Sequence, residues 1–268
     1  MNNSQEAIGV FDSGLGGLTV VKELIRLLPN ERIVYFGDTA RVPYGTKSGE
    51  TIIRYSREIV RVLLKHKVKM VVVACNTASS LALDVLKKDF DLPILGVIEP
   101  GVRKASEVTR NKKVGIIATS STVKSGKYAK KIVQLNKNIV VTSQACPLFV
   151  PLVEEGWFDH AVTYQVARQY LGDMKKNKID TLILGCTHYP LLKGVLHNIM
   201  GPNVRLVDSA REVALQVKEL LTKTRLLRTR LGSCRHMFIV SDEPKQFQRL
   251  ASRFLGRGVK NVRRHVYV

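Results

Sequence analysis

Residues 181–190 have the sequence Thr181-Leu182-Ile183-Leu184-Gly185-Cys186-Thr187-His188-Tyr189-Pro190. An uncharged apolar run stops at a glycine, and a cysteine follows at once. A stretch of the same build lies upstream at residues 70–79, with the sequence Met70-Val71-Val72-Val73-Ala74-Cys75-Asn76-Thr77-Ala78-Ser79. Short runs rich in Val, Ile and Leu and bounded by small residues are typical of buried parallel strands. Each cysteine is therefore predicted at the carboxyl end of a strand, the edge where open α/β sheets bind ligands.

The same alternation of strand and helix patterns runs through the chain twice. Apolar runs predict strands at residues 8–11, 32–36, 70–73 and 93–97, then at 114–118, 139–141, 181–184 and 204–207, with a last strand at 237–240. Helical spacing predicts helices at residues 18–28, 49–66, 78–88, 161–176, 210–221 and 244–255, and a further helical segment through residue 131. Cys75 and Cys186 are 111 positions apart, and each follows the third strand of its half. This repeat predicts two related α/β domains rather than a solenoid.

The predicted fold class is α/β, with two pseudo-symmetric domains that each hold a mainly parallel sheet flanked by helices, and with the active site in the cleft between them. The stretch Glu99-Pro100-Gly101 indicates a break between the two copies, because proline and glycine interrupt regular structure. If both domains need comparable sheets, the segment after residue 207 returns to the first one. The predicted division is 1–98 with 208–268 for a discontinuous first domain, and 99–207 for the second.

The composition indicates a globular protein of the cytoplasm. The chain has 268 residues, no apolar run as long as a bilayer span, and a polar stretch at residues 1–7 without a signal-peptide pattern. We therefore expect a cytoplasmic protein that does not bind membranes. The four cysteines, Cys75, Cys146, Cys186 and Cys234, are too scattered for a disulfide framework and have no zinc-site spacing. Reduced thiols and no metal site are expected.

The chain is strongly basic, with a formal net charge of +21 at pH 7. Residues 211–268 carry 14 Lys and Arg against 4 Asp and Glu. Clustered cations supply the salt-sensitive part of nucleic-acid binding. No recognised binding motif accompanies them, so a solvated basic surface is the favoured interpretation and a nucleic-acid partner is not expected. Electrostatic steering of a small anionic substrate is a further interpretation.

The first predicted strand ends in Asp12-Ser13-Gly14-Leu15-Gly16-Gly17, ahead of a helix. A glycine turn before a helix brings backbone N–H groups toward an anion. These glycines do not have the dinucleotide-binding spacing, and the carboxylate of Asp12 would repel a pyrophosphate. The turn suits a ligand ammonium group better.

Two similar domains that face each other place Cys75 and Cys186 on opposite walls of one cleft. A thiolate at the start of a helix has a lowered pKa and acts as a base or nucleophile. One thiolate and one thiol on the two faces of a substrate carbon can remove a proton from one side and donate one to the other, which inverts the centre without a metal or an electron-sink cofactor. A single free cysteine is often a small apolar core residue, but a matched pair at strand ends favours catalysis.

Other polar residues near these strand ends have weaker assignments from the residues alone. His188 fits a packing position and an acid–base role about equally well. Asp12 also suits a turn, and a solvated loop carboxylate is the favoured interpretation of Glu154. Cys146 is assigned to packing, and Cys234 has no counterpart in the repeat.

Several of these stretches together resemble the glutamate racemases of the aspartate/glutamate racemase family, over nearly the whole chain. The matching motifs are Phe11-Asp12-Ser13-Gly14-Leu15-Gly16-Gly17, Pro43-Tyr44-Gly45, Ala74-Cys75-Asn76-Thr77-Ala78, Pro147-Leu148-Phe149-Val150-Pro151-Leu152-Val153-Glu154-Glu155-Gly156 and Leu184-Gly185-Cys186-Thr187-His188-Tyr189-Pro190. Any one motif could occur by chance, but their joint order and the two cysteines make the resemblance specific.

The resemblance implies a cofactor-independent enzyme, commonly a homodimer, that interconverts L- and D-glutamate and supplies D-glutamate for peptidoglycan. It implies that Cys75 deprotonates D-glutamate, that Cys186 deprotonates L-glutamate, and that three further residues assist, namely Asp12, Glu154 and His188. The positions that match substrate contacts are Asp12, Ser13, Pro43, Tyr44, Gly45, Asn76, Thr77, Thr122, Thr187 and His188. Only the pair of thiols also follows from the repeat itself.

Three alternatives stay open at this point. The first is a racemase of aspartate or another amino acid on the same two-cysteine plan, because pocket length cannot be measured from sequence. The second is a basic nucleic-acid-binding protein with structural thiols. The third is a thiol redox enzyme, against which the absence of a Cys-x-x-Cys motif counts.

Overall fold

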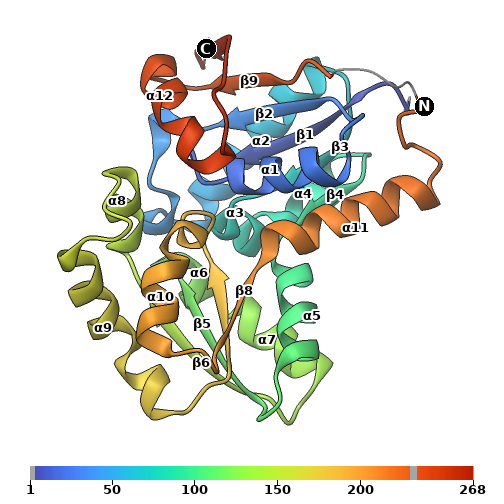
Figure 1. Ribbon diagram of the computed structural model, residues 1–268. Coiled ribbons are helices and arrows are strands. Elements are labelled where there is room, and N and C mark those ends of the chain that lie inside the picture. The colour runs from blue at the N-terminus through green and yellow to red at the C-terminus, as the bar shows by residue number, and fades with distance from the viewer. Residues whose placement is uncertain (1–3, 230–233, 268) are drawn as a thin grey trace.

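The computed structural model describes residues 4–229 and 234–267, so the polar stretch at residues 1–7 lies partly outside it. Helices cover both faces of two separate sheets (Figure 1). All strand pairs are parallel, which confirms the predicted fold class. None of the helices in the described ranges is both long and apolar enough to cross a bilayer.

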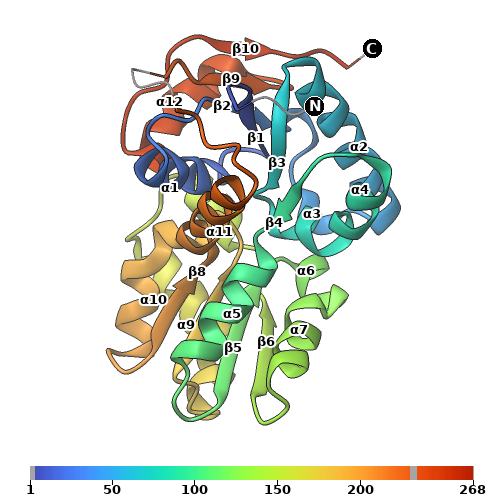
Figure 2. The ribbon, with the colours of Figure 1, turned by 90° about the vertical axis from the view of Figure 1, so that its right-hand side faces the viewer.

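The first sheet has, within the described residues, the strand order β10-β9-β2-β1-β3-β4. Its strands are β1 (Ala7–Asp12), β2 (Ile33–Gly37), β3 (Val68–Val73), β4 (Ile94–Gly96), β9 (Met237–Val240) and β10 (Val262–Arg264). One face carries α1 (Leu18–Leu27), α11 (Ser209–Lys223) and α12 (Pro244–Leu255), and the other carries α2 (Gly49–Lys65), α3 (Asn76–Leu81) and α4 (Leu83–Asp89) (Figure 2). Met70 and Val72 pack on the α1 side, whereas Val71 and Val73 pack on the α2 side. This alternation is expected of a strand that is buried on both faces.

The second sheet repeats this plan, with the order β6-β5-β7-β8. Its strands are β5 (Lys113–Ala118), β6 (Val140–Ala145), β7 (Thr181–Gly185) and β8 (Arg205–Asp208). Helices α5 (Ile98–Val108), α6 (Ser120–Ser125) and α7 (Lys127–Leu135) precede α8 (Phe149–Glu154), α9 (Ala161–Lys176) and α10 (Lys193–Met200) along the chain. In each half the second strand lies beside the first, and the third and fourth follow on the other side, as the repeat in the sequence predicts.

The two sheets and their helices form two lobes, which we call the first and the second lobe by the order of their sheets. The described chain passes between them after residues 97 and 208. Beyond the second crossing, α11 packs against α1 and α5, and β9 pairs with β2 of the first sheet. We therefore propose the domain division 1–98 with 208–268, and 99–207.

Several sequence-based expectations differ from the structure. The helix predicted at residues 78–88 is divided into α3 and α4 at Ala82. The expected break at residues 99–101 is the first turn of α5, where Pro100 is tolerated because the N–H groups of a first turn have no partner within the helix. The strand at residues 237–240 is not the last, because β10 follows it. The helical segment through residue 131 is divided into α6 and α7 at Gly126, whose φ of 64° is left-handed and ends a helix readily.

Candidate active site

The carboxyl ends of strands from both lobes meet at one cavity of about 310 Å³. Ser13 and Cys75 follow β1 and β3 of the first lobe, whereas Thr119 and Cys186 follow β5 and β7 of the second. The lining consists of Ser13, Val42, Pro43, Tyr44, Gly45, Thr46, Cys75, Asn76, Thr77, Thr119, Ser120, Pro147, Val150, Pro151, Glu154, Cys186, Thr187 and His188. Most of the predicted site residues, including both predicted catalytic thiols, therefore face one small space between the lobes.

Cys75 lies at the N-cap of α3 and is only 5% exposed. Its Sγ lies 3.7 Å from the Oγ of Ser13. Burial raises the pKa of this thiol to about 12, and the nearby carboxylate of Asp12 raises it further against the opposing hydrogen bonds from Ser13 and the backbone of Ala78. Cys75 is therefore a protonated thiol at neutral pH.

Cys186 has a cationic neighbour instead. Its Sγ lies 3.8 Å from Nδ1 of His188, and Nε2 of His188 lies 3.0 Å from Oε1 of Glu154. Burial alone would lower the pKa of His188, but its hydrogen bonds and charge interactions with Cys186 and Glu154 raise that pKa to about 10. The ring of Phe254 on α12 packs edge-on against the imidazole. His188 is therefore an imidazolium at neutral pH, held beside one of the two sulfur atoms.

Asp12 lies at the end of β1 and is fully buried. Its carboxylate accepts hydrogen bonds from the backbone N–H of Gly14 at 3.0 Å and from Oγ1 of Thr187 at 3.3 Å. Burial raises its pKa, although the charge of His188 and these hydrogen bonds oppose the rise. Asp12 lies just behind the described lining, where it contacts Thr187 and where its charge acts on the thiol of Cys75.

A group of hydroxyls joins the two lobes at the cavity wall. Oγ1 of Thr77 lies 2.9 Å from Oγ1 of Thr119 and 3.3 Å from Oγ1 of Thr122, and the last two lie 2.9 Å apart. Asn76 next to them accepts a hydrogen bond from Oη of Tyr128 at 2.7 Å. Thr122 is buried behind the lining, so it orients the other two hydroxyls.

The loop after β2 supplies a further wall through η1 (Thr39–Arg41) and η2 (Tyr44–Thr46). The Oη of Tyr44 donates to the fully buried carboxylate of Asp38 at 2.6 Å. The same carboxylate accepts hydrogen bonds from Ser241 at 2.8 Å and from Tyr267 at 3.0 Å. The C-terminal segment therefore fixes the loop that carries Tyr44.

Residues 8–217 match the family model described as Asp/Glu/Hydantoin racemase. This chain belongs to that racemase family. Over 257 residues it is 53% identical to the glutamate racemase of Geobacter metallireducens, which covers 96% of this chain and 95% of the relative. The resemblance drawn from the motifs is confirmed, and the protein is an enzyme of the racemase class.

Solved structures of glutamate racemases share the fold of this racemase. The isoform from Bacillus anthracis has a TM-score of 0.94 at 39% identity, with 98% of each chain covered. The enzyme from Francisella tularensis, solved in complex with D-glutamate, has a TM-score of 0.92 at 38% identity, again with 98% of each chain covered. Both lobes therefore take part in the similarity.

Sequence reasoning missed part of the lining of the racemase cavity. Thr119 and Ser120 line it, and a signal for Thr119 existed, because β5 repeats β1 and places Thr119 where the first lobe has Ser13. The remaining residues that were missed are Val42, Thr46, Pro147, Val150 and Pro151. Most of these are apolar and have no chemical signature, so only the fold could assign them.

Proposed function

We propose that this racemase interconverts L- and D-glutamate by proton transfer at the α-carbon, with Cys75 and Cys186 on the two faces of the substrate. The observation that carries the proposal is that thiols from equivalent strands of two lobes line one 310 Å³ cavity. Removal of a proton from one face and its return from the other inverts the carbon. The names of similar proteins support glutamate as the substrate.

The surroundings of the two sulfur atoms suggest a direction for the resting enzyme. The imidazolium of His188 lies beside Cys186, whereas burial and Asp12 keep Cys75 protonated. In our proposal Cys186 removes the α-proton of L-glutamate and Cys75 donates one to the opposite face. The reverse reaction starts from the state that this step leaves, in which Cys75 has given up its proton and Cys186 holds one, with the carboxylate of Asp12 near Cys75.

Neutral donors hold the substrate in this proposal. The charged side chains of the described lining are Glu154 and, when protonated, His188, so hydroxyl and amide groups must bind the two carboxylates of glutamate. The cluster of Thr77, Thr119 and Thr122 suits one of them. Ser13 and Thr187, which lie by the two thiols, suit the groups on the α-carbon.

The reaction is tested by α-proton exchange in deuterated water, with L-glutamate, D-glutamate and aspartate offered separately without added cofactor. Our proposal expects deuterium in the inverted glutamate. Inversion of aspartate without any exchange at glutamate would agree with the thiol mechanism but would show that glutamate is not the substrate. No exchange with any of them, in a folded and reduced sample, would overturn the proposal.

The two-base mechanism is tested by Cys75→Ala and Cys186→Ala. Loss of either acid–base group should lower the rate of racemisation by about 10²–10⁴-fold, because proton transfer by a positioned side chain contributes that much. Cys146→Ala is the matched control, since Cys146 is a buried thiol outside the cavity lining. Circular dichroism reports whether each variant is folded. Racemisation at the full rate by either of the first two variants would contradict the mechanism.

The finer biological role is also a proposal. We propose that the enzyme works in the cytoplasm as a homodimer and supplies D-glutamate for peptidoglycan, as the family resemblance implies. Sedimentation of the purified protein tests the oligomeric state. Rescue of a bacterial strain that requires D-glutamate tests the supply, and the Cys186→Ala variant is its negative control.

A further inference from the structure

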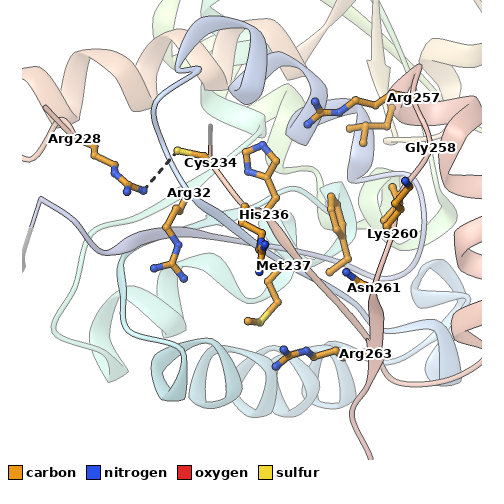
Figure 3. Close-up of a pocket in the computed structure, with 14 residues that line it drawn as sticks. Arg32, Arg228, Cys234, His236, Met237, Arg257, Gly258, Lys260, Asn261 and Arg263 are labelled. Carbon is orange, nitrogen blue, oxygen red and sulfur yellow. Dashed lines mark hydrogen bonds between the residues drawn. The ribbon is translucent and has the colours of Figure 1, made fainter. Parts of the chain in front are cut away.

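A second and larger cavity, of about 1000 Å³, lies on the first lobe (Figure 3). Its described lining is Arg32, Arg228, Cys234, Arg235, His236, Met237, Phe238, Leu255, Arg257, Gly258, Val259, Lys260, Asn261 and Arg263. Arg32 precedes β2, His236 precedes β9 and Asn261 precedes β10, so the cavity lies at the amino ends of these parallel strands. The catalytic cavity lies at the carboxyl ends, and the two are therefore separate sites.

This amino-end cavity is strongly cationic. Six of its lining side chains are guanidinium or ammonium groups, and the described lining contains no carboxylate. None of these six makes an ion pair with another described residue. Six positive charges that repel one another thus lie around one concave space, and none is paired with a described carboxylate side chain. This arrangement favours an anionic ligand in the cavity. Several of the Lys and Arg residues that make residues 211–268 basic therefore line this cavity.

Two polar atoms of the lining have no partner in the described structure. Nε of Arg228 and Nδ1 of His236 are buried and make no hydrogen bond, although Nη1 of Arg228 lies 3.5 Å from Sγ of Cys234. An unsatisfied buried donor is costly, so such groups usually mark a ligand, ion or water site. Burial and the charge of Arg257 lower the pKa of His236 to about 4, and a bound anion would reverse the second effect.

The cavity also has an apolar side, formed by Met237, Phe238, Leu255 and Val259. A site that combines several cations with an apolar wall suits an anion attached to an uncharged ring better than a free monovalent ion. Phe238 is the one Phe, Tyr or Trp among the described lining residues, so the cavity lacks the series of aromatic rings on which a nucleic-acid strand stacks its successive bases. The concave shape likewise favours a small molecule over a duplex.

We propose that the amino-end cavity binds a small phosphorylated ligand that carries a diphosphate or triphosphate group. The phosphates lie among the arginine and lysine side chains, where guanidinium groups bind phosphate oxygens in pairs. The apolar wall receives the rest of the ligand. The site is independent of the proposed reaction, because it shares no residue with the catalytic cavity.

Isothermal titration calorimetry of the full chain with inorganic pyrophosphate and with ADP tests this site. The variant Arg257→Glu/Lys260→Glu reverses two exposed charges of the lining and should weaken binding by about tenfold or more, because it replaces charge-assisted hydrogen bonds with repulsion. The control Lys137→Glu/Lys218→Glu makes the same change in net charge at two exposed positions outside the lining, and should weaken binding by less than about twofold. Tighter binding of ADP than of pyrophosphate would show that the part of the ligand attached to the phosphates contacts the apolar wall.

A second readout uses the unaltered protein. Saturation with pyrophosphate or ADP should raise the pKa of His236 in an NMR titration, because a bound anion favours the imidazolium. The proposal is overturned if neither compound binds with saturation, or if the control pair weakens binding as much as the lining pair. Binding of an oligonucleotide that requires Arg257 and Lys260, without binding of pyrophosphate or ADP, would replace it with a nucleic-acid partner.

Discussion

Equivalent strands deliver Cys75 and Cys186 to the catalytic cavity, yet the two thiols have different neighbours. Cys75 is followed by Asn76 and Thr77, whereas Cys186 is followed by Thr187 and an ionisable histidine. The repeat therefore places the sulfur atoms symmetrically but gives only one of them a cation. The sequence alone could not assign a role to His188, because that role depends on Glu154. Glu154 belongs to another element, α8, and its Oε1 lies 3.0 Å from Nε2 of His188.

Glu154→Gln tests this relation at the level of one side chain. The variant removes a negative charge that supports the imidazolium, so the pKa of His188 should fall from about 10 toward its ordinary value near 6.5. If the imidazolium is required, the alkaline limb of the kcat/KM profile should move to lower pH by the same amount. The profile and an NMR titration of the imidazole measure it, with Glu155→Gln, an exposed neighbour, as control.

The raised pKa of His188 also links stability to pH. His188 holds its proton more tightly in the folded state than in the unfolded state. Its contribution to the free energy of unfolding is therefore fully present below pH 6.5 and is lost as the pH rises toward about 10. Glu154→Gln should make this loss smaller and complete at lower pH, because the loss ends at the folded-state pKa. An unfolding series across that range in which the variant and the parent lose stability in parallel would contradict the assignment.

A second buried charge holds the first sheet to the segment that returns from the second lobe. Nζ of Lys69 lies 2.6 Å from Oε2 of Glu31 and also donates to the carbonyl of Leu226 at 2.8 Å. Lys69→Met should lower the free energy of unfolding by about 3–5 kcal/mol, because it leaves a buried carboxylate without its charge partner. Urea unfolding measures it. The double variant with Glu31→Gln should recover part of the loss, and no recovery would show that packing of the lysine stem dominates.

At the scale of helices and strands, prediction succeeds where the signal is local. The strands before Cys75 and Cys186 are buried on both faces, and the apolar runs at residues 70–74 and 182–184 within or next to them are typical of such strands. β10 was missed because Val262–Arg264 has one apolar residue and is held at the sheet edge by pairing with β9. The start of α5 was misread because proline ends a helix in its interior but begins one readily. The first case depends on a tertiary neighbour that a local pattern does not contain, whereas the second reflects the two positions that proline can take relative to a helix.

The turn after β1 and the turn after β7 approach each other closely across the lobes. A Cβ added at Gly16 would lie 2.2 Å from Oγ1 of Thr187 and 2.6 Å from Nδ1 of His188. Gly16→Ala should therefore displace both side chains, lower stability by about 1–3 kcal/mol as overpacking does, and reduce kcat. Thermal unfolding and steady-state kinetics test it.

Gly172→Ala in the interior of α9 is the matched control, because nothing lies within 4 Å of its Cβ position. It should raise stability by about 0.5–1 kcal/mol through helix propensity and leave kcat unchanged. If both glycine variants behave alike, the close approach of the two turns has no role in the site.

At the scale of the whole molecule, the lobes are joined where the chain crosses between them after residues 97 and 208. Val97 and Asp208 line the same small gap, and a Cβ added at Gly101 would lie 2.9 Å from Oγ of Ser209. The two crossings therefore lie side by side. Because both connections are at one place, they resist rotation of one lobe against the other less than any other motion. The repeat foretold two lobes, but the proximity of the crossings follows only from the packing of α11 on α5.

Such a rotation should be visible in the kinetics. The cavity is bounded by contacts between the lobes, including the hydrogen bond from Oγ of Ser121 to the carbonyl of Gly45 at 2.7 Å, and we expect substrate exchange to require these contacts to separate. We expect kcat to fall as sucrose raises solvent viscosity, because domain motions of this kind often limit turnover. The slow Cys75→Ala variant should show no such dependence. A viscosity-independent parent enzyme would place the limiting step in proton transfer.

If the lobes rotate apart about the neighbouring crossings, an open molecule would lack the complete acid–base pair of the proposed mechanism. Each lobe keeps its own sulfur atom, so separation of the lobes to admit a ligand also moves Cys75 away from Cys186. In the proposed mechanism, the arrangement of the two thiols would therefore form in each turnover cycle and separate at its end. Weaker contacts between the lobes would speed ligand exchange, but they would also shorten the time for which the two thiols face the same carbon atom.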